Sequence, residues 1–372
     1  MNRTISGTGV PGRAWIEVDL GAVRHNVREL KRRAPSSSLM AVVKADAYGH
    51  GAVEVALAAR DAGAESFAVV TVEEGAELRE GGISEPILVF TDLLPDRLPA
   101  AEEYRLTVTA HSLESARRIS AHPGVSAHLK VNTGMNRWGV EPGEVGEARR
   151  ILGGQLAGVY THFACADSDA EETKRQIRVF DEVLAAYPFG GALMHAANSA
   201  GTLWHPESYY GCVRPGVALY GLHPAGDEGD PRDEALRPAL SLKSYVADIR
   251  HLEPGDGVSY GLTFRAREPM RAATVPAGYA EGYRRTLSGK PTEALIGGRR
   301  RPLLGRVTMD ASVFGVDDSV EVGDEVVLIG EQAGGRILAE EVGRWAGTIN
   351  YEVTTGVNPR RVERSYTDDE KP

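Results

Sequence analysis

The chain has 372 residues, of which 42% are hydrophobic and 25% are charged, a composition typical of a globular protein. Its formal net charge is −10 and no block of basic residues stands out, which argues against nucleic acid and anionic membranes as partners. A single hydrophobic core rarely grows to this size, and we therefore expect two domains.

The cysteines and the apolar runs narrow the class of protein further. Cys165 and Cys212 are too few for a disulfide scaffold and lack metal-site spacing, so we interpret both as buried thiols and expect no metal. Residues 1–15 contain no apolar segment like that of a signal peptide, and no later run is long enough to span a membrane. We expect a cytoplasmic protein.

Short apolar runs, typical of strands, recur over the first part of the chain, and most are followed by a polar turn and a helical pattern. The eight runs cover residues 39–44, 66–71, 86–91, 106–110, 126–131, 156–163, 192–198 and 213–222. Strands that alternate with helices imply right-handed crossovers and a parallel sheet. Eight such units favour a closed (β/α)8 barrel of the TIM type. An open doubly wound sheet is the alternative, but its Gly-rich phosphate turn is missing after the first run, where the sequence is "YGHG".

The sequence pattern changes after about residue 225, where the polar, Pro- and Gly-rich stretch "HPAGDEGDPRDEALRP" is typical of a loop between domains. Short Val-rich runs separated by turns such as "EPGDG" and "EVGDE" follow it, with one helical pattern, "LAEEVGRWAGT". This pattern indicates a mostly-β second domain. We predict an α/β chain with a barrel domain over residues 1–240 and a β-rich C-terminal domain over residues 241–372.

Lys44 stands at the end of the first apolar run, in "AVVKADAYGHGA". On this stretch alone, the simpler interpretation is a lysine with its head in water. The alternative is a desolvated lysine with a lowered pKa, able to act as nucleophile or base.

Further polar residues follow the other predicted strands, and the active site of such a barrel lies at the C-terminal ends of its strands. Together with Lys44, the residues at these ends are Tyr48, Lys130, Arg137, His162, Asn198, Ser199 and Arg214. The set offers an amine nucleophile, hydroxyl ligands for a phosphate, two guanidinium groups and a histidine, but no acidic pair suited to a metal or to glycosidic cleavage. Pyridoxal 5'-phosphate needs a lysine, a phosphate cradle and a partner for its ring nitrogen.

Motifs in order along nearly the whole chain resemble those of the alanine racemase family. They are "AVVKADAYGHG" (41–51), "HLKVNTGMNRWG" (128–139), "THFACAD" (161–167), "HAANSAG" (195–201), "VRPGVALYG" (213–221), "GVSYGLTF" (257–264), "GYAEGYRR" (278–285), "GRVTMD" (305–310) and "INYEVTTGVNPRRV" (349–362). The resemblance implies a pyridoxal-phosphate-dependent isomerase that interconverts L- and D-alanine and supplies D-alanine for peptidoglycan. It also implies a homodimer with shared active sites.

The resemblance assigns the proton transfers to two residues. Lys44 corresponds to the lysine that forms a Schiff base with the cofactor and serves as one base, and Tyr260 in "VSYG" corresponds to the second base, delivered by the partner subunit. A tyrosine needs help to act as a base near neutral pH, which a hydrogen-bond chain from Tyr260 through His162 to Arg214 would provide. Arg214 corresponds to the partner of the pyridine nitrogen, and because arginine keeps its proton, that nitrogen stays neutral.

The resemblance also assigns the binding groups. Those expected to hold the cofactor, besides Lys44, His162 and Arg214, are Tyr48, Asn198, Ser199, Tyr351 and the backbone N–H groups of Gly216 and Val217. Arg137 and the backbone N–H of Met309 are expected to meet the substrate carboxylate, and Lys130 corresponds to a lysine that is often carbamylated. Tyr279 and Tyr351 are expected to narrow the entrance.

Three positions depart from the family pattern: Asn132 and Glu281 replace aspartates, and Thr308 replaces a frequent cysteine. Thr308 leaves the preference for the substrate side chain open, so a racemase of broader specificity, acting for example on serine, is the nearest alternative. A barrel-type decarboxylase is disfavoured by Arg214 and by the lack of a cysteine after residue 212. A non-enzymatic pyridoxal-phosphate carrier is disfavoured by Tyr260 and the second domain.

Overall fold

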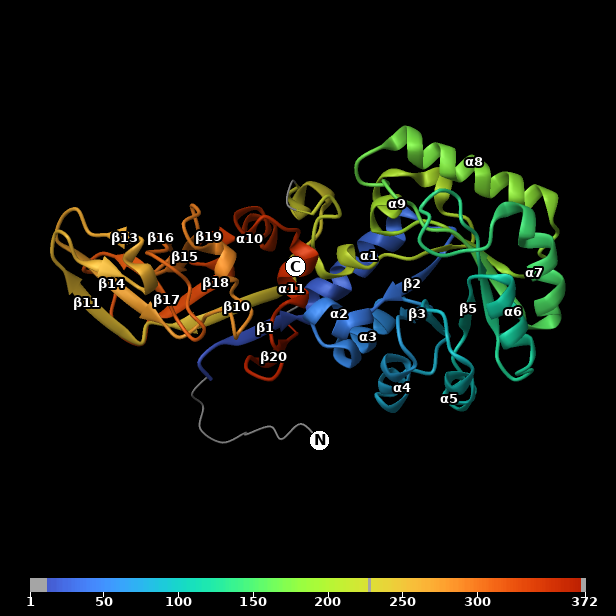
Figure 1. Ribbon diagram of the computed structural model, residues 1–372, viewed down its shortest axis with the longest axis horizontal. Helices are drawn as coiled ribbons and strands as arrows, with labels where there is room; N and C mark the ends of the chain where they lie inside the picture. Colours follow the sequence, from blue (N-terminus) through green and yellow to red (C-terminus); the bar gives the residue numbers. More distant parts are fainter. Residues whose placement is uncertain (1–11, 227–228, 369–372) are drawn as a thin grey trace. The chain divides into compact units, whose positions relative to one another are not determined.

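The computed structural model of the protein describes residues 12–226 and 229–368. The described chain forms two compact units, which we call the barrel unit (20–225 and 229–237) and the β-rich unit (12–19, 226 and 238–368). Figure 1 colours the chain along its sequence, from blue at the N-terminus to red at the C-terminus.

The barrel unit is built on eight parallel strands in the order β4-β3-β2-β9-β8-β7-β6-β5. A parallel bridge between Leu88 and Thr107 links the two edges of this sheet, so that it closes on itself. The strands are β2 (Ser38–Val42), β3 (Ser66–Val69), β4 (Ile87–Val89), β5 (Val108–Ala110), β6 (Ala127–Lys130), β7 (Leu156–Tyr160), β8 (Leu193–His195) and β9 (Cys212–Val213). The predicted barrel is confirmed.

Helices surround the strands of the barrel, as Figure 1 shows for α3 to α8. The helices of this unit are α1 (Leu20–Arg33), α2 (Lys44–Gly49), α3 (Ala52–Asp61), α4 (Val72–Glu80), α5 (Leu98–Glu103), α6 (Leu113–Ser120), α7 (Val145–Leu152), α8 (Ala170–Ala186) and α9 (Ser199–Trp204). Their starts follow local capping chemistry: Thr71 and Glu74 form a capping box on α4, and Asp169 accepts two backbone N–H bonds at the start of α8.

The last predicted strand, residues 213–222, is mostly not a strand. β9 ends at Val213, and Val217–Tyr220 form a buried 3-10 helix. Pro215 follows closely and has no N–H to continue the strand pairing, although its carbonyl still accepts from the Val42 N–H at 3.0 Å. An apolar run can be buried in either conformation, which is why the pattern alone did not separate them.

The β-rich unit contains a sheet with the order β16-β15-β18-β10-β1-β20, a three-stranded sheet β11-β14-β17 and the pair β12-β13. β19 pairs with β18. The strands are β1 (Trp15–Asp19), β10 (Leu240–Tyr245), β11 (Asp248–Leu252), β12 (Gly257–Val258), β13 (Phe264–Arg265), β14 (Met270–Val275), β15 (Glu293–Ile296), β16 (Arg299–Pro302), β17 (Ser312–Val316), β18 (Glu325–Gln332), β19 (Gly335–Ile337) and β20 (Glu363–Thr367). Two helices, α10 (Ala339–Ala346) and α11 (Asn350–Thr355), complete it. The mostly-β character predicted for this part is confirmed.

The boundary between the units differs from the predicted one at the start of the chain. The prediction placed residues 1–240 in the barrel, of which 1–11 lie outside the described residues. Strand β1 belongs to the β-rich unit, because it pairs antiparallel with β10 and parallel with β20. Pairing partners more than 200 residues away leave no trace in the local pattern of "WIEVD".

Within the described ranges, every helix is too short or too polar to cross a membrane. The same residues bring together no group of three His, Cys, Asp or Glu side chains that could hold a metal ion.

Candidate active site

Lys44 follows β2 and begins a left-handed turn. The four residues after it, 45–48, all have φ between 52° and 55°. None of them is glycine, and a left-handed conformation costs an ordinary residue about 1–2 kcal/mol. Such a run persists only where the surrounding structure holds it, and such strain gathers at functional sites.

Two carboxylates hold this turn. Asp46 Oδ1 accepts from the Ala52 N–H at 2.9 Å, which ties the turn to the start of α3. Glu74 on α4 accepts from the Ala45 N–H at 2.6 Å and from the Val70 N–H at 2.7 Å. The residue next to Lys44 is thereby anchored to the neighbouring strand end.

Lys44 is half-buried, and burial lowers its pKa, helped by the nearby positive charge of Arg137 and opposed by Glu74. Lys130 at the end of β6 is 4% exposed, and burial, followed by Arg137 and Arg214, lowers its pKa to about 8. The barrel therefore gathers positive groups at the C-terminal ends of its strands. This surplus suits a phosphorylated cofactor and a carboxylate substrate.

Arg214 is 3% exposed and held from several sides. Its Nη2 donates to the Thr161 carbonyl at 2.9 Å and to the Ala196 carbonyl at 3.0 Å, and lies 3.4 Å from His162 Nδ1. Its Nη1 lies 2.9 Å from His195 Nδ1. Burial lowers the pKa of Arg214 to about 10, so the guanidinium remains charged near neutral pH. It can donate to a ring nitrogen but cannot protonate it.

His162 is half-buried beside Arg214, and desolvation and that guanidinium hold its pKa well below its ordinary value. The ring is therefore neutral and can donate from one nitrogen while accepting at the other. A histidine that links a base to Arg214 through hydrogen bonds must be able to donate on one side and accept on the other.

Tyr48, Ser199 and Gly216 lie together near the ends of β2, β8 and β9. Ser199 Oγ accepts from the N–H groups of Gly216 at 2.9 Å and Ala218 at 3.2 Å. A Cβ added to Gly216 would lie 2.7 Å from the Tyr48 hydroxyl, so only glycine fits there. Hydroxyls and backbone N–H groups around a position without a side chain fit a phosphate group.

Two further residues predicted to bind the cofactor, Val217 and Asn198, lie next to the group formed by Tyr48, Ser199 and Gly216, which we call the phosphate cradle. Val217 is buried at the start of the 3-10 helix that follows Gly216. Asn198 caps α9, with its Oδ1 accepting from the Gly201 N–H at 2.9 Å. The pyridoxal phosphate expected from the sequence fits the residues that the barrel unit contributes.

Arg137 lies in the loop after β6, which Asn132 organises. The Asn132 amide donates to Asn136 Oδ1 and to Glu141 Oε1, both at 2.9 Å, and its oxygen accepts from the Asn136 N–H at 3.0 Å. An aspartate at this position could not donate the first two bonds. Asn132 is thus matched to its neighbours in this chain.

Four predicted residues belong to the β-rich unit. Tyr260 is 74% exposed, Met309 52% and Tyr279 42%, whereas Tyr351 is half-buried on α11. The Tyr279 N–H donates to the Thr308 carbonyl at 3.0 Å, so the loops carrying Tyr279 and Met309 lie side by side. The Thr308 hydroxyl bonds within its own turn, accepting from the Ala311 N–H at 3.1 Å.

Three contributors to the barrel site were not predicted from the sequence: His195, Glu74 and Gln176. His195 stands in the motif "HAANSAG", where only its place at a strand end signalled a role. Glu74 sits three residues after Thr71, a spacing that announces a capping box but not the bond to Ala45. A buried glutamine within the polar pattern of α8 gave no signal.

Comparison with known families and proteins covers both units. The family described as "Alanine racemase, N-terminal domain" matches residues 18–224, and "Alanine racemase, C-terminal domain" matches residues 239–366. A protein of Symbiobacterium thermophilum named alanine racemase is 45% identical over 369 residues, covering 95% of this chain and 96% of that protein. Alanine racemase 1 of Bacillus subtilis is 38% identical, covering 93% of this chain and 91% of that protein.

Solved structures agree with the sequence relatives. The crystal structure of alanine racemase from D-cycloserine-producing Streptomyces lavendulae has a TM-score of 0.90 at 38% identity, covering 97% of this chain and 98% of that one. Alanine racemase from E. faecalis has a TM-score of 0.90 at 34% identity, covering 96% and 98%.

Proposed function

The chain belongs to the alanine racemase family, and from this premise we propose that it interconverts L- and D-alanine with two bases, Lys44 and Tyr260. The family consists of pyridoxal-phosphate-dependent isomerases. The D-alanine formed would supply peptidoglycan synthesis. The observation that carries the proposal is the half-buried amine of Lys44, with its lowered pKa, in a strained turn at the C-terminal end of a barrel strand.

Racemisation requires a proton to leave one face of Cα and another to arrive on the opposite face. When bound, pyridoxal phosphate withdraws electrons from the substrate amine and so makes the Cα proton removable. Lys44 takes or returns that proton on one face, and its lowered pKa leaves more of the amine in the basic form near neutral pH. Tyr260 serves the other face, supported by a hydrogen-bond chain through His162 to Arg214, in which the guanidinium donates a hydrogen bond and keeps its proton.

We propose that Tyr260 acts in the site of a second copy of the chain, in a homodimer. The tyrosine is 74% exposed on its own unit, and Leu262 in the same turn is 48% exposed. Exposed apolar side chains clustered on one turn are typical of a surface that a partner covers. Tyr279 and Met309 extend this set of exposed residues.

Cofactor binding is proposed to use the neutral donors of the cradle. Tyr48, Ser199 and the N–H groups of Gly216 and Val217 would hold the phosphate, with Tyr351 adding a further hydroxyl. Asn198 would act through the cap that orients Ser199. Arg214 would face the ring nitrogen and leave it unprotonated, which limits side reactions.

Substrate binding is proposed to use Arg137 and the backbone N–H of Met309, which would hold the carboxylate. Lys130 would be carbamylated, because a pKa of about 8 leaves a fraction of its amine unprotonated and reactive towards carbon dioxide. A carbamate would place a negative charge beside Arg137 and orient it.

The test is a chiral assay of purified protein with alanine, serine and lysine as separate substrates. We expect alanine to be racemised fastest from either enantiomer. Equal or faster turnover of serine would replace the proposal by a broader racemase, and no racemisation of any of the three would refute it. A cytoplasmic location remains part of the proposal, and cell fractionation with an antibody checks it.

A further inference from the structure

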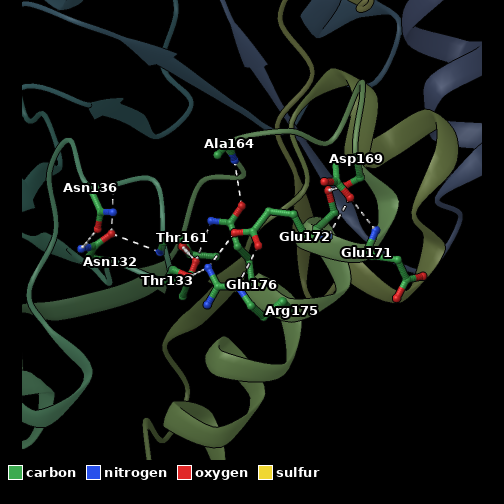
Figure 2. A network of polar contacts seen from close by, with 12 residues as sticks. Asn132, Thr133, Asn136, Thr161, Ala164, Asp169, Glu171, Glu172, Arg175 and Gln176 are labelled. Atoms are coloured by element: carbon green, nitrogen blue, oxygen red, sulfur yellow. Dashed lines mark hydrogen bonds and ion pairs between the residues drawn. The ribbon is translucent and has the colours of Figure 1, made fainter.

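Gln176 on α8 is fully buried and connects two loops at the C-terminal end of the barrel. Figure 2 shows its amide between Thr133, which follows β6, and Ala164, which follows β7. Its Nε2 donates to Thr133 Oγ1 at 3.1 Å and to the His162 carbonyl at 3.3 Å. Its Oε1 accepts from the Ala164 N–H at 2.8 Å. One side chain thus bonds to the loop after β6 and to the loop after β7, the latter at His162, whose ring lies beside Arg214.

The direction of the hydrogen bonds requires an amide at this position. The Thr161 hydroxyl donates to the Val131 carbonyl at 3.0 Å, so in the 2.7 Å contact between the two hydroxyls Thr133 must be the donor. Thr133 Oγ1 then needs a donor of its own, which Gln176 Nε2 supplies. A carboxylate could accept from Ala164 but could not complete this chain.

The residues of this hydrogen-bond chain lie next to catalytic groups of the proposed function. The carbonyl of Thr161 accepts from Arg214 Nη2 at 2.9 Å, and His162 is the next residue. On the other side, Thr133 lies four residues before Arg137 in the loop after β6. A second contact supports the same link, since Arg175 Nη2 donates to the Thr133 carbonyl at 3.3 Å. Helix α8, capped by Asp169, is the rigid element behind both loops.

We propose that Gln176 is a positioning residue: its amide holds the loops after β6 and β7 so that His162 and Arg137 keep their places. The expected effect on racemisation rests on the proposed function. The effect on the two loops can be measured without an activity assay. Loss of the amide leaves the Ala164 N–H without its acceptor inside the protein, which favours local opening of the loop.

Gln155 provides a matched control in the same unit. Its Nε2 donates to three backbone carbonyls, those of Ile119, His122 and Val125, at 2.8 to 3.1 Å. It precedes β7, whereas His162 follows β7, so the two glutamines serve opposite ends of one strand. Gln155→Leu therefore removes similar bonds far from the proposed site.

The first experiment compares Gln176→Leu and Gln155→Leu with the wild-type holoenzyme by hydrogen exchange. We expect exchange in the peptide containing Ala164, and in the peptide spanning residues 132–138, to become about tenfold faster in Gln176→Leu, because each loop loses a bond. Gln155→Leu should leave both peptides unchanged. Unchanged exchange in Gln176→Leu, or equal acceleration in both variants, would overturn the proposal.

The second experiment measures kcat and KM for alanine. Gln176→Leu should lower kcat/KM by about 10- to 100-fold through both a higher KM and a lower kcat, since a small displacement of binding and relay groups is costly. Thr133→Val should cause part of this loss and Thr133→Ser should restore it, which keeps the test valid if Gln176→Leu folds poorly. If Thr133→Val and Thr133→Ser behave alike, the hydroxyl chain does not position the loops. Inactive wild-type protein would refute the proposed function alone, since the exchange result would still decide the role of Gln176.

Discussion

The two proposed bases occupy contrasting surroundings. Lys44 is half-buried, and its burial, followed by the charge of Arg137 and opposed by Glu74, lowers its pKa within one copy of the chain. Tyr260 is 74% exposed in a short turn of the β-rich unit. The proposed base Lys44 is thus surrounded by residues of its own barrel unit, whereas the proposed base Tyr260 lies exposed on the surface of the β-rich unit. The proposed homodimer, in which a second copy completes the site, would account for this difference.

The largest effect is expected from removing the buried base. Lys44→Ala should lower the racemisation rate by at least about 10⁴-fold, since it removes both a base and the cofactor's covalent attachment. Lys174→Ala is the matched control, because Lys174 is an exposed lysine of the barrel unit paired with Glu171. Borohydride reduction followed by peptide mapping should place the cofactor on Lys44. An adduct on another lysine would contradict the assignment.

Removing the exposed base should reveal which face each base serves. We expect Tyr260→Phe to lower racemisation by about 10³-fold while cofactor binding survives. In D2O this variant should still exchange the Cα hydrogen of D-alanine, the enantiomer whose proton the family resemblance assigns to Lys44, because Lys44 can return a deuteron from solvent to the same face. L-alanine should exchange far more slowly. Tyr245→Phe in the same unit is the control, and near wild-type turnover by Tyr260→Phe would exclude it as a base.

Arg214 connects the two halves of the comparison, since it lies beside His162 and is proposed to face the ring nitrogen. Arg214→Glu should favour a protonated ring, slow racemisation by about 10²- to 10³-fold, and give long-wavelength absorbance with gradual loss of activity by transamination. Arg214→Lys keeps the charge and should show neither spectral change nor transamination. If Arg214→Glu is slow but shows neither long-wavelength absorbance nor transamination, Arg214 does not control the protonation of the pyridine ring.

The smallest effect concerns Lys130 and depends on pH. Its lowered pKa of about 8 means that the free amine needed for a carbamate is lost as pH falls below 8 and gained as pH rises through it. Added bicarbonate should therefore lower the KM for alanine a few-fold at pH 8 to 9 and have less effect at pH 6. NMR with 13C-labelled carbon dioxide reports the carbamate directly, and Lys130→Ala is the control. A bicarbonate effect that survives in Lys130→Ala would have another origin.

The contrast between the regions also explains what could be predicted from the sequence. The positions of Lys44, Lys130 and His162 at the ends of predicted strands indicated that they lie at the site. A repeated local pattern determines the barrel topology, and the topology determines where the strand ends meet. The left-handed turn over residues 45–48 could not be predicted from the sequence, because "ADAY" contains no glycine. The turn is held by a hydrogen bond to Glu74, which lies on another helix. Local propensity contains no record of such distant bonds.

Two further differences have the same cause. The residues of β1 were assigned to the barrel, because their local pattern does not reveal the partners β10 and β20, which lie more than 200 residues further along the chain. The role of Gln176 depends on a single amide orientation within α8, which a helical pattern does not encode. Tyr260 was assigned as a base through family resemblance alone, since an exposed tyrosine in a turn has no distinguishing pattern.

The most direct test of the shared site mixes Lys44→Ala and Tyr260→Phe proteins. If Tyr260 serves the site of the partner copy, each mixed dimer contains one site with both bases intact and one with neither. Random exchange of equal amounts makes about half of the dimers mixed, so about a quarter of wild-type activity should return. Two variants that each remain inactive alone, and that stay inactive together after mass spectrometry has verified subunit exchange, would contradict the shared site.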